Sequence, residues 1–599
     1  MTGRSGGQQK TLRSQDWFDN ADEPGLSVLY LERFMNYGLS REELQSGRPI
    51  IGISQTGSDL APCNRHHLQL ADRLRAGIRD AGGIPMEFGV HPIQETCRRP
   101  TAALDRNLSY LSQVEVLHGY PLDGVVFTTG CDKTTPAALM AAATTDLPAI
   151  VFSGGPMLNG WLDGERVGSG TILFKAREKF ARGEIDEEGY WRIVSSGAPS
   201  AGHCNTMGTA STMNCLAEAL GMSLPDCASI PGPHQARAEM AYETGRAAVV
   251  AVLEDRRPST IMTRAAFENA IRVCSAIGGS TNAIVHLNAI ASLMGIELSM
   301  RDWQQIGHDI PLLVNMQPAG EYLGEEFWRA GGVRAVLAEL ANAGLLHTSA
   351  PTISGEGIGK GVKPSRDREV IRSFDNPLLT SAGFRVLSGN IFNSAIMKSS
   401  GISAEFRSRY LEDPKDPDAF TGSAVVFEGP EDYASHIDDV DLEIDENSIL
   451  VMRGVGPIGH PGSAEVVNMQ PPKHLLKQGF SSLPCIGDGR QSGTSGSPSI
   501  LHASPEAAAG GNLALLQTGD RIRVDLAKGT VNVDLDPAEL QERRARLEAA
   551  GGYAVPPSQT PWQQLHRDHV NQLDVGMAFD LASDYQQVCA LTSLPRFNH

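Results

Sequence analysis

The stretch "VVFTTGCDKTTPAAL", residues 125–139, decides the fold. An apolar run ends at a glycine, and Cys131, Asp132 and Lys133 follow in a row. A helix is then expected to begin with Thr135 as its cap and a proline in its first turn. A buried strand that leads into a helix is the repeating unit of a parallel α/β sheet, and ligands bind where such strands end. The stretch therefore predicts both a fold class and the place of a site.

The neighbouring residues repeat the same alternation of strand and helix. Strands are predicted for "PIIGIS" (49–54), "IPMEFGV" (84–90) and "PAIVFSGG" (148–155), and an amphipathic helix for residues 66–83. Further along, residues 205–220 predict a buried helix of small side chains. Residues 263–295 predict two helices around a Gly-Gly turn. This half of the chain is expected to form an α/β domain with a mostly parallel sheet.

The second half of the chain differs in composition and in predicted secondary structure. Residues 348–380 are rich in glycine, serine and proline, which indicates a linker or an excursion between domains. After them come predicted strands in "FRVLSG", "GSAVVFEG" and "SILVMRG", and a hairpin over 520–536 that turns at Lys528 and Gly529. We therefore expect an α/β domain over residues 1–380 and a β-rich, barrel-like domain over residues 381–599.

The composition excludes several classes of protein. The 599 residues are 41% hydrophobic and 20% charged, as in soluble globular proteins. The formal net charge of −19 argues against binding to nucleic acid or to an anionic membrane. No apolar run approaches the roughly 18 residues of a membrane span. The first twenty residues contain no apolar signal core, so a cytoplasmic protein is expected.

Three of the nine cysteines share one setting. Cys63, Cys131 and Cys204 each stand just before a predicted helix, where the N-terminus favours a thiolate. Three thiolates at one end of a sheet can converge on iron and leave it an open position, or they can be separate structural cysteines. The other six are expected to be reduced, buried and apolar in behaviour: Cys97, Cys215, Cys227, Cys274, Cys485 and Cys589.

Hard metal ligands stand beside these thiols. Asp132 follows Cys131 directly, and Glu95 falls in the loop after another predicted strand. Carboxylates at strand ends suit Mg²⁺, although each can also be a helix cap or a surface ion pair. Lys133 leaves two interpretations open. Its amine can bind a substrate carboxylate, or it can be carbamylated and so become an oxygen ligand.

Two glycine-rich loops belong to the second domain. Residues 454–469, "GVGPIGHPGSAEVVNM", match G-x-G-x-x-G, but the prolines that follow prevent the helix that a dinucleotide site needs. We interpret this segment as a glycine-rich loop that brings the backbone close to a bound molecule. Glu465 in this loop is a possible metal ligand. Residues 487–499, "GDGRQSGTSGSPS", form a second such loop. The chain has no G-x-S-x-G motif and no P-loop, so hydrolase and nucleotidase functions find little support.

Several multi-residue motifs are similar to those of a known protein family. "PCN", "GCDKTTP", "HCNTMGTASTM", "GGSTNA" and "GPIGHPGSAEVVNM" occur in this order and make the chain resemble the dihydroxy-acid and phosphogluconate dehydratase family over essentially its whole length. The stretches "RRPTAALDRNLSYL" and "GDGRQSGT" are similar to the sugar-acid branch of that family. The implied fold is an α/β N-terminal domain and a C-terminal β-barrel-like domain with the active site between them.

The resemblance also implies the cofactors and the site residues. It implies a [2Fe–2S] cluster on Cys63, Cys131 and Cys204. It implies Mg²⁺ on Glu95, Asp132, Glu465 and a carbamylated Lys133. Ser492 matches the proposed general base, and Thr494 lies beside it in the substrate loop. Family members are homodimers or homotetramers, and no nucleic acid or membrane partner is expected.

The implied reaction is dehydration of an aldonate to a 2-keto-3-deoxy acid, with D-xylonate as the expected substrate. L-arabinonate and D-gluconate are the nearest alternatives. A branched-chain dihydroxy acid would require an apolar pocket, and 6-phosphogluconate would require additional Lys or Arg at its far end. The alternative that is not an enzyme is an iron–sulfur binding or redox-sensing protein without turnover. It would need neither the magnesium ligands nor the Ser492 loop.

Overall fold

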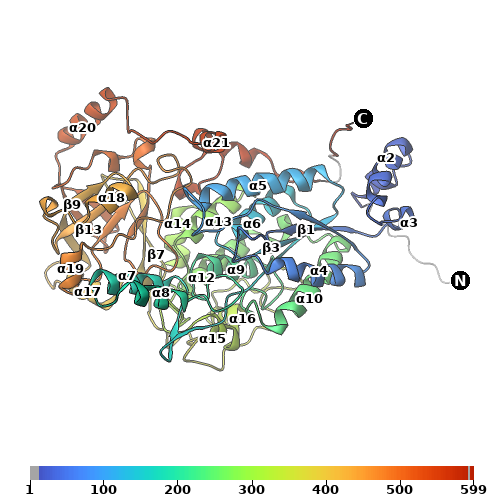
Figure 1. Ribbon diagram of the computed structural model, residues 1–599, viewed down its shortest axis with the longest axis horizontal. Coiled ribbons are helices and arrows are strands. Elements are labelled where there is room, and N and C mark those ends of the chain that lie inside the picture. The colour runs from blue at the N-terminus through green and yellow to red at the C-terminus, as the bar shows by residue number, and fades with distance from the viewer. Residues whose placement is uncertain (1–11, 591–593, 599) are drawn as a thin grey trace.

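The computed structural model describes residues 12–590 and 594–598. Most of the stretch on which the expectation of a cytoplasmic protein rests, residues 1–11, lies outside these ranges. Figure 1 shows the N-terminal sheet, in blue, at one end and the yellow-to-red strands of the C-terminal part at the other. Within the described ranges, every helix is too short or too polar to cross a bilayer.

The N-terminal sheet has four parallel strands in the order β2-β1-β3-β4. Their bounds are Ile50–Gln55 (β1), Ile84–Gly89 (β2), Gly124–Thr129 (β3) and Ala149–Ser153 (β4). Every residue of β1, β3 and β4 is buried, which explains their continuous apolar sequences. The predicted parallel α/β domain is confirmed.

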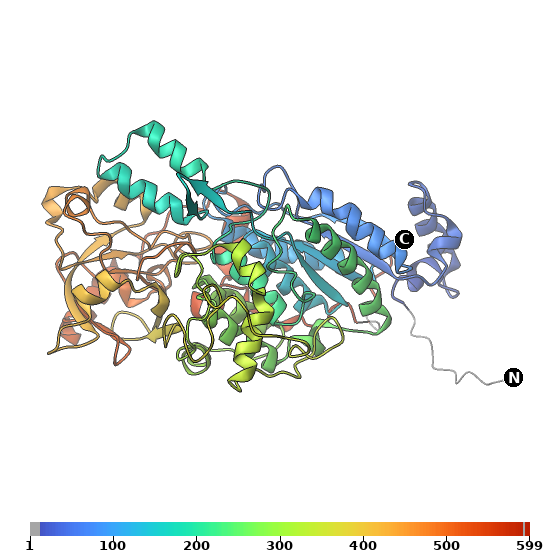
Figure 2. The same ribbon diagram turned by 90° about the horizontal axis from the view of Figure 1, so that it is seen from below.

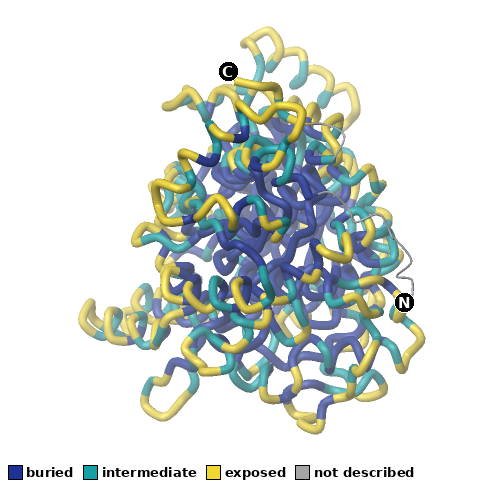
Figure 3. Tube along the Cα trace, turned by 90° about the vertical axis from the view of Figure 1, so that its right-hand side faces the viewer, coloured by how far each residue is buried: buried dark blue, intermediate teal, exposed yellow. Residues whose placement is uncertain are grey.

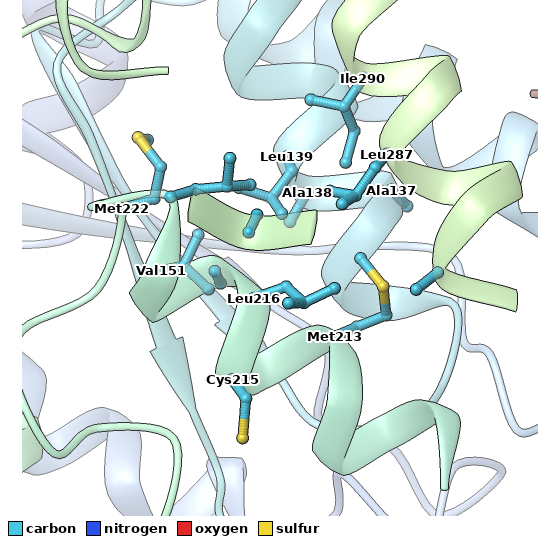
Figure 4. Packing of buried hydrophobic residues seen from close by; sticks show 14 of the residues in the cluster. Ala137, Ala138, Leu139, Val151, Met213, Cys215, Leu216, Met222, Leu287 and Ile290 are labelled. Carbon is cyan, nitrogen blue, oxygen red and sulfur yellow. The ribbon is translucent and has the colours of Figure 1, made fainter. Parts of the chain in front are cut away.

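Some helices cover this sheet and others pack against those helices, and together they supply most of the core. They include α4 (His67–Asp80), α5 (Ala102–Gly119), α6 (Thr134–Thr145), α9 (Thr209–Ala219), α10 (Gln235–Leu253), α12 (Arg264–Ala276), α13 (Asn282–Leu293) and α16 (Gly332–Asn342). All twelve residues of α6 are buried. Figure 4 shows why: Leu139 of α6 lies among Leu216 of α9 and Leu287 of α13. The helix that follows the deciding stretch is therefore central to the core.

Two helices begin at other residues than the sequence predicts. Helix α6 begins at Thr134, with Lys133 at the cap position, and not after Thr135. The Thr135 hydroxyl donates to Asn214 Oδ1 (3.1 Å) and so does not cap its own helix. Helix α9 begins at Thr209, because residues 205–208 form irregular chain that leads out of Cys204.

The C-terminal domain contains an eight-stranded mixed sheet in the order β14-β13-β9-β10-β11-β12-β8-β7. The bounds are Phe384–Leu387 (β7), Ser394–Lys398 (β8), Ala419–Phe427 (β9), Ser448–Met452 (β10), Cys485–Gly487 (β11), Ile500–Ser504 (β12), Arg521–Asp525 (β13) and Thr530–Val533 (β14). Ser388, just after β7, accepts from Val531 N of β14 at 2.9 Å and donates to the Gly529 carbonyl at 3.0 Å. These bonds join the two ends of the sheet, so the predicted barrel-like domain is confirmed.

The segment 348–380 contains no helix or strand, but it is tied to the N-terminal half. Leu379 pairs with Leu312, and Ile371 pairs with Val314. Ile353 and Ile371 are fully buried. Figure 3 shows buried chain running through the interior, with the exposed turns outside. The segment is therefore an ordered excursion over the core and not a free linker.

A small subdomain lies beside the barrel. It consists of the hairpin β5 (Gly160–Leu162) and β6 (Glu165–Val167) with helices α7 (Thr171–Ala181) and α8 (Glu187–Ser195). Figure 2 shows these teal helices at one edge of the molecule, beside the orange strands. Arg182, just after α7, donates to the Leu476 carbonyl of α19 (Lys473–Lys477) at 3.0 Å. The subdomain thus connects the two parts of the chain next to the site described below.

Candidate active site between the two domains

A cavity of about 820 Å³ lies where the parallel strands end and the C-terminal domain begins. Eight of the nine residues singled out from the sequence line it: Cys63, Glu95, Cys131, Asp132, Cys204, Glu465, Ser492 and Thr494. The ninth, Lys133, is fully buried beside them. Loops after β1, β2 and β3 contribute from one domain, and loops after β10 and β11 contribute from the other.

Three carboxylates form the polar end of this cavity. Glu95, Asp132 and Glu465 each offer an oxygen, and these oxygens all lie within 4.8 Å of one another. The Lys133 amine stands among them, with Nζ 2.9 Å from Glu95 Oε2, 3.4 Å from Glu465 Oε1 and 4.0 Å from Asp132 Oδ2. The amine therefore belongs to the carboxylate group.

The burial of these charges has an electrostatic cost. Burial raises the pKa of Asp132 to about 8, and burial together with the Glu95 charge raises the pKa of Glu465. Burial alone would lower the pKa of Lys133, but the Glu95 and Glu465 carboxylates outweigh it and raise that pKa above its usual value. An ammonium ion therefore balances part of the negative charge.

The donor set fits a hard divalent cation. All three side chains offer oxygen, and their spacing is compatible with metal–oxygen distances of roughly 2.0–2.1 Å for Mg²⁺. The Oε2 atom of Glu95 is buried and accepts no well-directed hydrogen bond, although Lys133 lies close to it. This oxygen therefore has a lone pair with which it can coordinate a metal ion.

The three cysteines lie at the same cavity but are not equivalent. The Cys63 and Cys131 thiols interact directly, which lowers the pKa of Cys63 to about 7 and raises that of Cys131. Burial raises the pKa of Cys204 to about 12. The interaction with Cys63 and burial raise the pKa of Cys131, and burial raises that of Cys204, so the helix N-termini alone do not make these two thiols acidic.

Each sulfur accepts a hydrogen bond that the sequence did not reveal. Gln94 Nε2 donates to Cys63 at 3.2 Å, the Glu95 backbone N–H donates to Cys131 at 3.4 Å, and Ser169 Oγ donates to Cys204 at 3.4 Å. Donors of this kind stabilise sulfur that carries negative charge, as a metal-bound thiolate does.

The remaining cysteines follow the expectation with one exception. Five of the six are buried and all six are free. Cys97 is exposed, because it follows Glu95 on the irregular loop after β2 instead of packing under a helix. The prediction that it is buried was therefore wrong.

The Ser492 loop fits closely against the N-terminal domain. Ser492 Oγ pairs with Thr494 Oγ1 at 2.9 Å, and no described histidine or carboxylate forms a hydrogen bond with it. A Cβ at Gly493 would lie 2.5 Å from Thr209 N. Gly170 has φ +81°, and a Cβ there would lie 2.5 Å from Thr494 Oγ1. Gly493 therefore lets the loop approach the backbone of α9, and Gly170 leaves room for the Thr494 side chain.

Two further residues contact the carboxylate group. Glu465 Oε1 accepts from Asn282 Nδ2 at 2.6 Å and from Arg490 Nη1 at 2.9 Å, and both donors are fully buried. Asn282 lies in "GGSTNA" and Arg490 lies two residues before Ser492, so both stood inside motifs already singled out. Neither is a usual Mg²⁺ ligand, which is why ligand chemistry alone did not select them.

Comparison with known proteins agrees with this geometry. The sequence matches the dihydroxy-acid/6-phosphogluconate dehydratase N-terminal domain over residues 48–361 and the C-terminal domain of the same family over residues 369–577. It is 58% identical to "D-xylonate dehydratase" of Caulobacter vibrioides, over 98% of both chains. It is 45% identical to "L-arabinonate dehydratase" of Rhizobium leguminosarum bv. trifolii, over 95% of this chain and 96% of the relative.

A more distant relative is "Dihydroxy-acid dehydratase" of Caldanaerobacter subterraneus subsp. tengcongensis, 37% identical over 87% of this chain and 91% of the relative. The relatives share one reaction class, the removal of water, and both family domains match here in order. This chain, with its two domains meeting at a cavity of carboxylates and cysteines, is therefore a hydro-lyase and belongs to the dihydroxy-acid/6-phosphogluconate dehydratase family.

Proposed function

We propose that the protein dehydrates D-xylonate to the corresponding 2-keto-3-deoxy acid. One observation carries the proposal: three oxygen ligands, three cysteines and the Ser492 loop line a single cavity. The named substrate follows from similarity, since the relative with 58% identity is a D-xylonate dehydratase.

We assign Mg²⁺ to Glu95, Asp132, Glu465 and Lys133, the last as its carbamate. The position of the Lys133 amine among the carboxylates supports this assignment, because a carbamate there adds an oxygen donor to the same group. When bound, the cation supplies positive charge that stabilises a substrate anion. Lys133 would otherwise keep its proton and compete with the metal for the carboxylates.

We assign a [2Fe–2S] cluster to Cys63, Cys131 and Cys204. Cys63 and Cys131 lie close enough to shift each other's pKa, whereas the only described group of three ligand atoms that lie within 4.8 Å of one another is the carboxylate group. The three sulfurs are therefore spread more widely, as one close pair and one separate thiol. These three cysteines would hold the cluster if it were bound, and their spacing is wider than that of ligands on a single small ion. When bound, the cluster supplies a Lewis acid for a leaving hydroxyl.

In this proposal Ser492 moves the proton. As an alkoxide, its Oγ takes the proton from C2 of the substrate while the C3–O bond breaks, and that proton then passes to the departing hydroxide, which leaves as water and restores the alkoxide. The resulting enol loses the proton of its C2 hydroxyl, gains a proton at C3 and becomes the keto acid, so no net oxidation occurs. Thr494, 2.9 Å from Ser492 Oγ, orients that hydroxyl. A serine alone is too weak a base at neutral pH, so its role depends on a nearby cation.

The wider organisation stays a prediction. We propose a division into an α/β domain over residues 1–380 and a barrel-like domain over residues 381–599. We also propose a homodimer or homotetramer in the cytoplasm that acts on a small sugar acid and binds neither nucleic acid nor membrane.

A substrate panel tests the proposed function. The protein is purified without oxygen, supplied with Mg²⁺ and bicarbonate, and assayed for 2-keto-acid formation from D-xylonate, L-arabinonate, D-gluconate, 6-phosphogluconate and a branched dihydroxy acid. Turnover led by D-xylonate supports the proposal. Faster turnover of L-arabinonate than of D-xylonate would support the same reaction with a different substrate. L-arabinonate is the second candidate because one relative, 45% identical, is an L-arabinonate dehydratase. An intact cluster with no turnover on any of them favours the sensor alternative.

A further inference from the structure

The Glu465 carboxylate is held from both domains. Its Oε1 accepts from Asn282 Nδ2, at the start of α13 in the N-terminal domain. The same oxygen accepts from Arg490 Nη1, at the base of the Ser492 loop in the C-terminal domain. Arg490 Nη1 also donates to Asn282 Oδ1 at 3.1 Å, so the two donors contact each other as well. The three side chains form a closed triangle in which Asn282 and Arg490 are fully buried and Glu465 faces the cavity.

Arg490 connects the metal-ligand segment to the loop that carries Ser492. Its Nε donates to the Ser463 carbonyl at 2.7 Å, and its backbone N–H donates to the Ala464 carbonyl at 3.1 Å. Its own carbonyl accepts from Val467 N at 3.0 Å. Glu465 is therefore enclosed between bonds to Arg490 on either side. A shift of Arg490 would move Glu465 and the Ser492 loop together.

Asn282 makes the matching connection on the other domain. Its Nδ2 donates to Thr209 Oγ1 at 2.9 Å and approaches the Gln491 carbonyl at 3.4 Å. Thr209 is the first residue of α9, and Gln491 lies between Arg490 and Ser492. One amide thus joins the helix after Cys204, the metal ligand Glu465 and the serine loop.

Charge gives Arg490 a second role. Three carboxylates exceed the charge of one divalent cation, and a substrate acid adds more negative charge. The Arg490 Nη2 atom is buried, forms no hydrogen bond and lies 3.8 Å from Glu95 Oε1. A guanidinium keeps its charge at any working pH, so it offsets this excess permanently. A buried donor without a partner is unusual, and it points at the carboxylate group.

We propose that Arg490 and Asn282 are positioning residues that fix the Glu465 carboxylate for the divalent cation and set the Ser492 loop in register with it. The proposal rests on the proposed function, because it concerns the same metal site. Neither residue is proposed to touch the reacting atoms. Partners of this kind orient ligands, and their loss typically weakens metal affinity by about 10–100-fold.

The test measures metal binding directly. Mg²⁺ affinity of the full-length, cluster-loaded protein is measured by calorimetry for wild type, Arg490→Lys and Asn282→Ala, and kcat and KM are measured in parallel. We expect at least tenfold weaker Mg²⁺ binding in both variants, and a fall in kcat that excess Mg²⁺ only partly restores. The visible absorption of the cluster is expected to stay unchanged. Arg13→Lys is the matched control, because Arg13 is a buried arginine that donates to the Leu117 carbonyl, far from the cavity.

The outcomes separate the two proposals. Wild-type Mg²⁺ affinity in either variant that keeps its cluster overturns the positioning role. If Arg490→Lys does not fold, Asn282→Ala decides the question. An equal loss of affinity in Arg13→Lys also overturns it, because general destabilisation would then explain the effect. Failure of the wild-type protein to bind Mg²⁺ or to turn over sugar acids contradicts the proposed function itself.

Discussion

The Nζ atom of Lys133 lies 2.9 Å from Oε2 of Glu95. The buried amine therefore occupies a position among carboxylates that favours a cation. In the metal-free protein this amine carries a proton, because the neighbouring carboxylates raise its pKa. Asp132 is protonated as well below its pKa of about 8. Metal binding must therefore release protons from this group.

Mg²⁺ affinity is accordingly expected to rise with pH. The cation binds the ionised form of Asp132, and this form increases as the pH approaches about 8. Affinity should rise by up to about tenfold per pH unit for each proton released. Bicarbonate should strengthen binding further if Lys133 becomes a carbamate. Calorimetry at several pH values, in buffers of different ionisation enthalpy, measures both the affinity and the protons released. A constant affinity between about pH 6 and pH 8 would contradict this expectation.

Replacing Ser492 by alanine should abolish turnover while the cluster remains. The substitution removes the hydroxyl that pairs with Thr494 and leaves every sulfur and carboxylate in place. The visible spectrum and Mg²⁺ affinity should match wild type. Ser497→Ala is the control from the same loop, since that hydroxyl pairs with Ser499 instead. Turnover near the wild-type rate in Ser492→Ala would remove Ser492 from the mechanism.

Replacing Cys131 by serine should remove the cluster. Cys131 is buried beside Cys63, and serine is a poor ligand for iron in such a site. Iron content and visible absorption should fall, while the circular dichroism spectrum stays that of a folded protein. Cys97→Ser is the control, because Cys97 is exposed and does not line the cavity. An unchanged spectrum in Cys131→Ser would refute the ligand assignment.

Adding a methyl group at position 493 should displace the serine loop. A Cβ there would lie 2.5 Å from the Thr209 backbone nitrogen, so the loop or α9 must move. A misplacement of about 1 Å can cost on the order of 100-fold in rate, and kcat for Gly493→Ala should fall by about that much. Gly496→Ala is the matched control, because nothing lies within 4 Å of a Cβ there. Equal rates in the two variants would show that the close contact is unimportant.

Much of the architecture was predictable because it depends on local patterns. The buried strands β1, β3 and β4 are continuous apolar runs, and a parallel sheet places their ends together. This is why Cys63, Cys131 and Asp132 could be assigned to one edge. The barrel-like domain was predictable as a class, but its strand order was not, because pairing such as β9 with β13 depends on contacts distant in sequence.

The supporting residues of the site were harder to foresee. Asn282 and Arg490 bind the Glu465 carboxylate from 183 and 25 residues away in the sequence, so no local pattern connects them to it. The raised pKa values of Cys131 and Cys204 could not be foreseen for a related reason. Helix position is visible in the sequence, whereas the depth of burial is a property of the assembled fold.

The order of the site residues along the chain has a consequence for biosynthesis. All three cysteines precede residue 205, on the domain that leaves the ribosome first, whereas Glu465 and Ser492 come more than two hundred residues later. A growing chain thus presents these three cysteines, together with Glu95, Asp132 and Lys133, long before Glu465 and Ser492 are made. Under the proposed assignment, the cluster can be inserted into the N-terminal part alone, whereas turnover requires that the C-terminal domain has also folded.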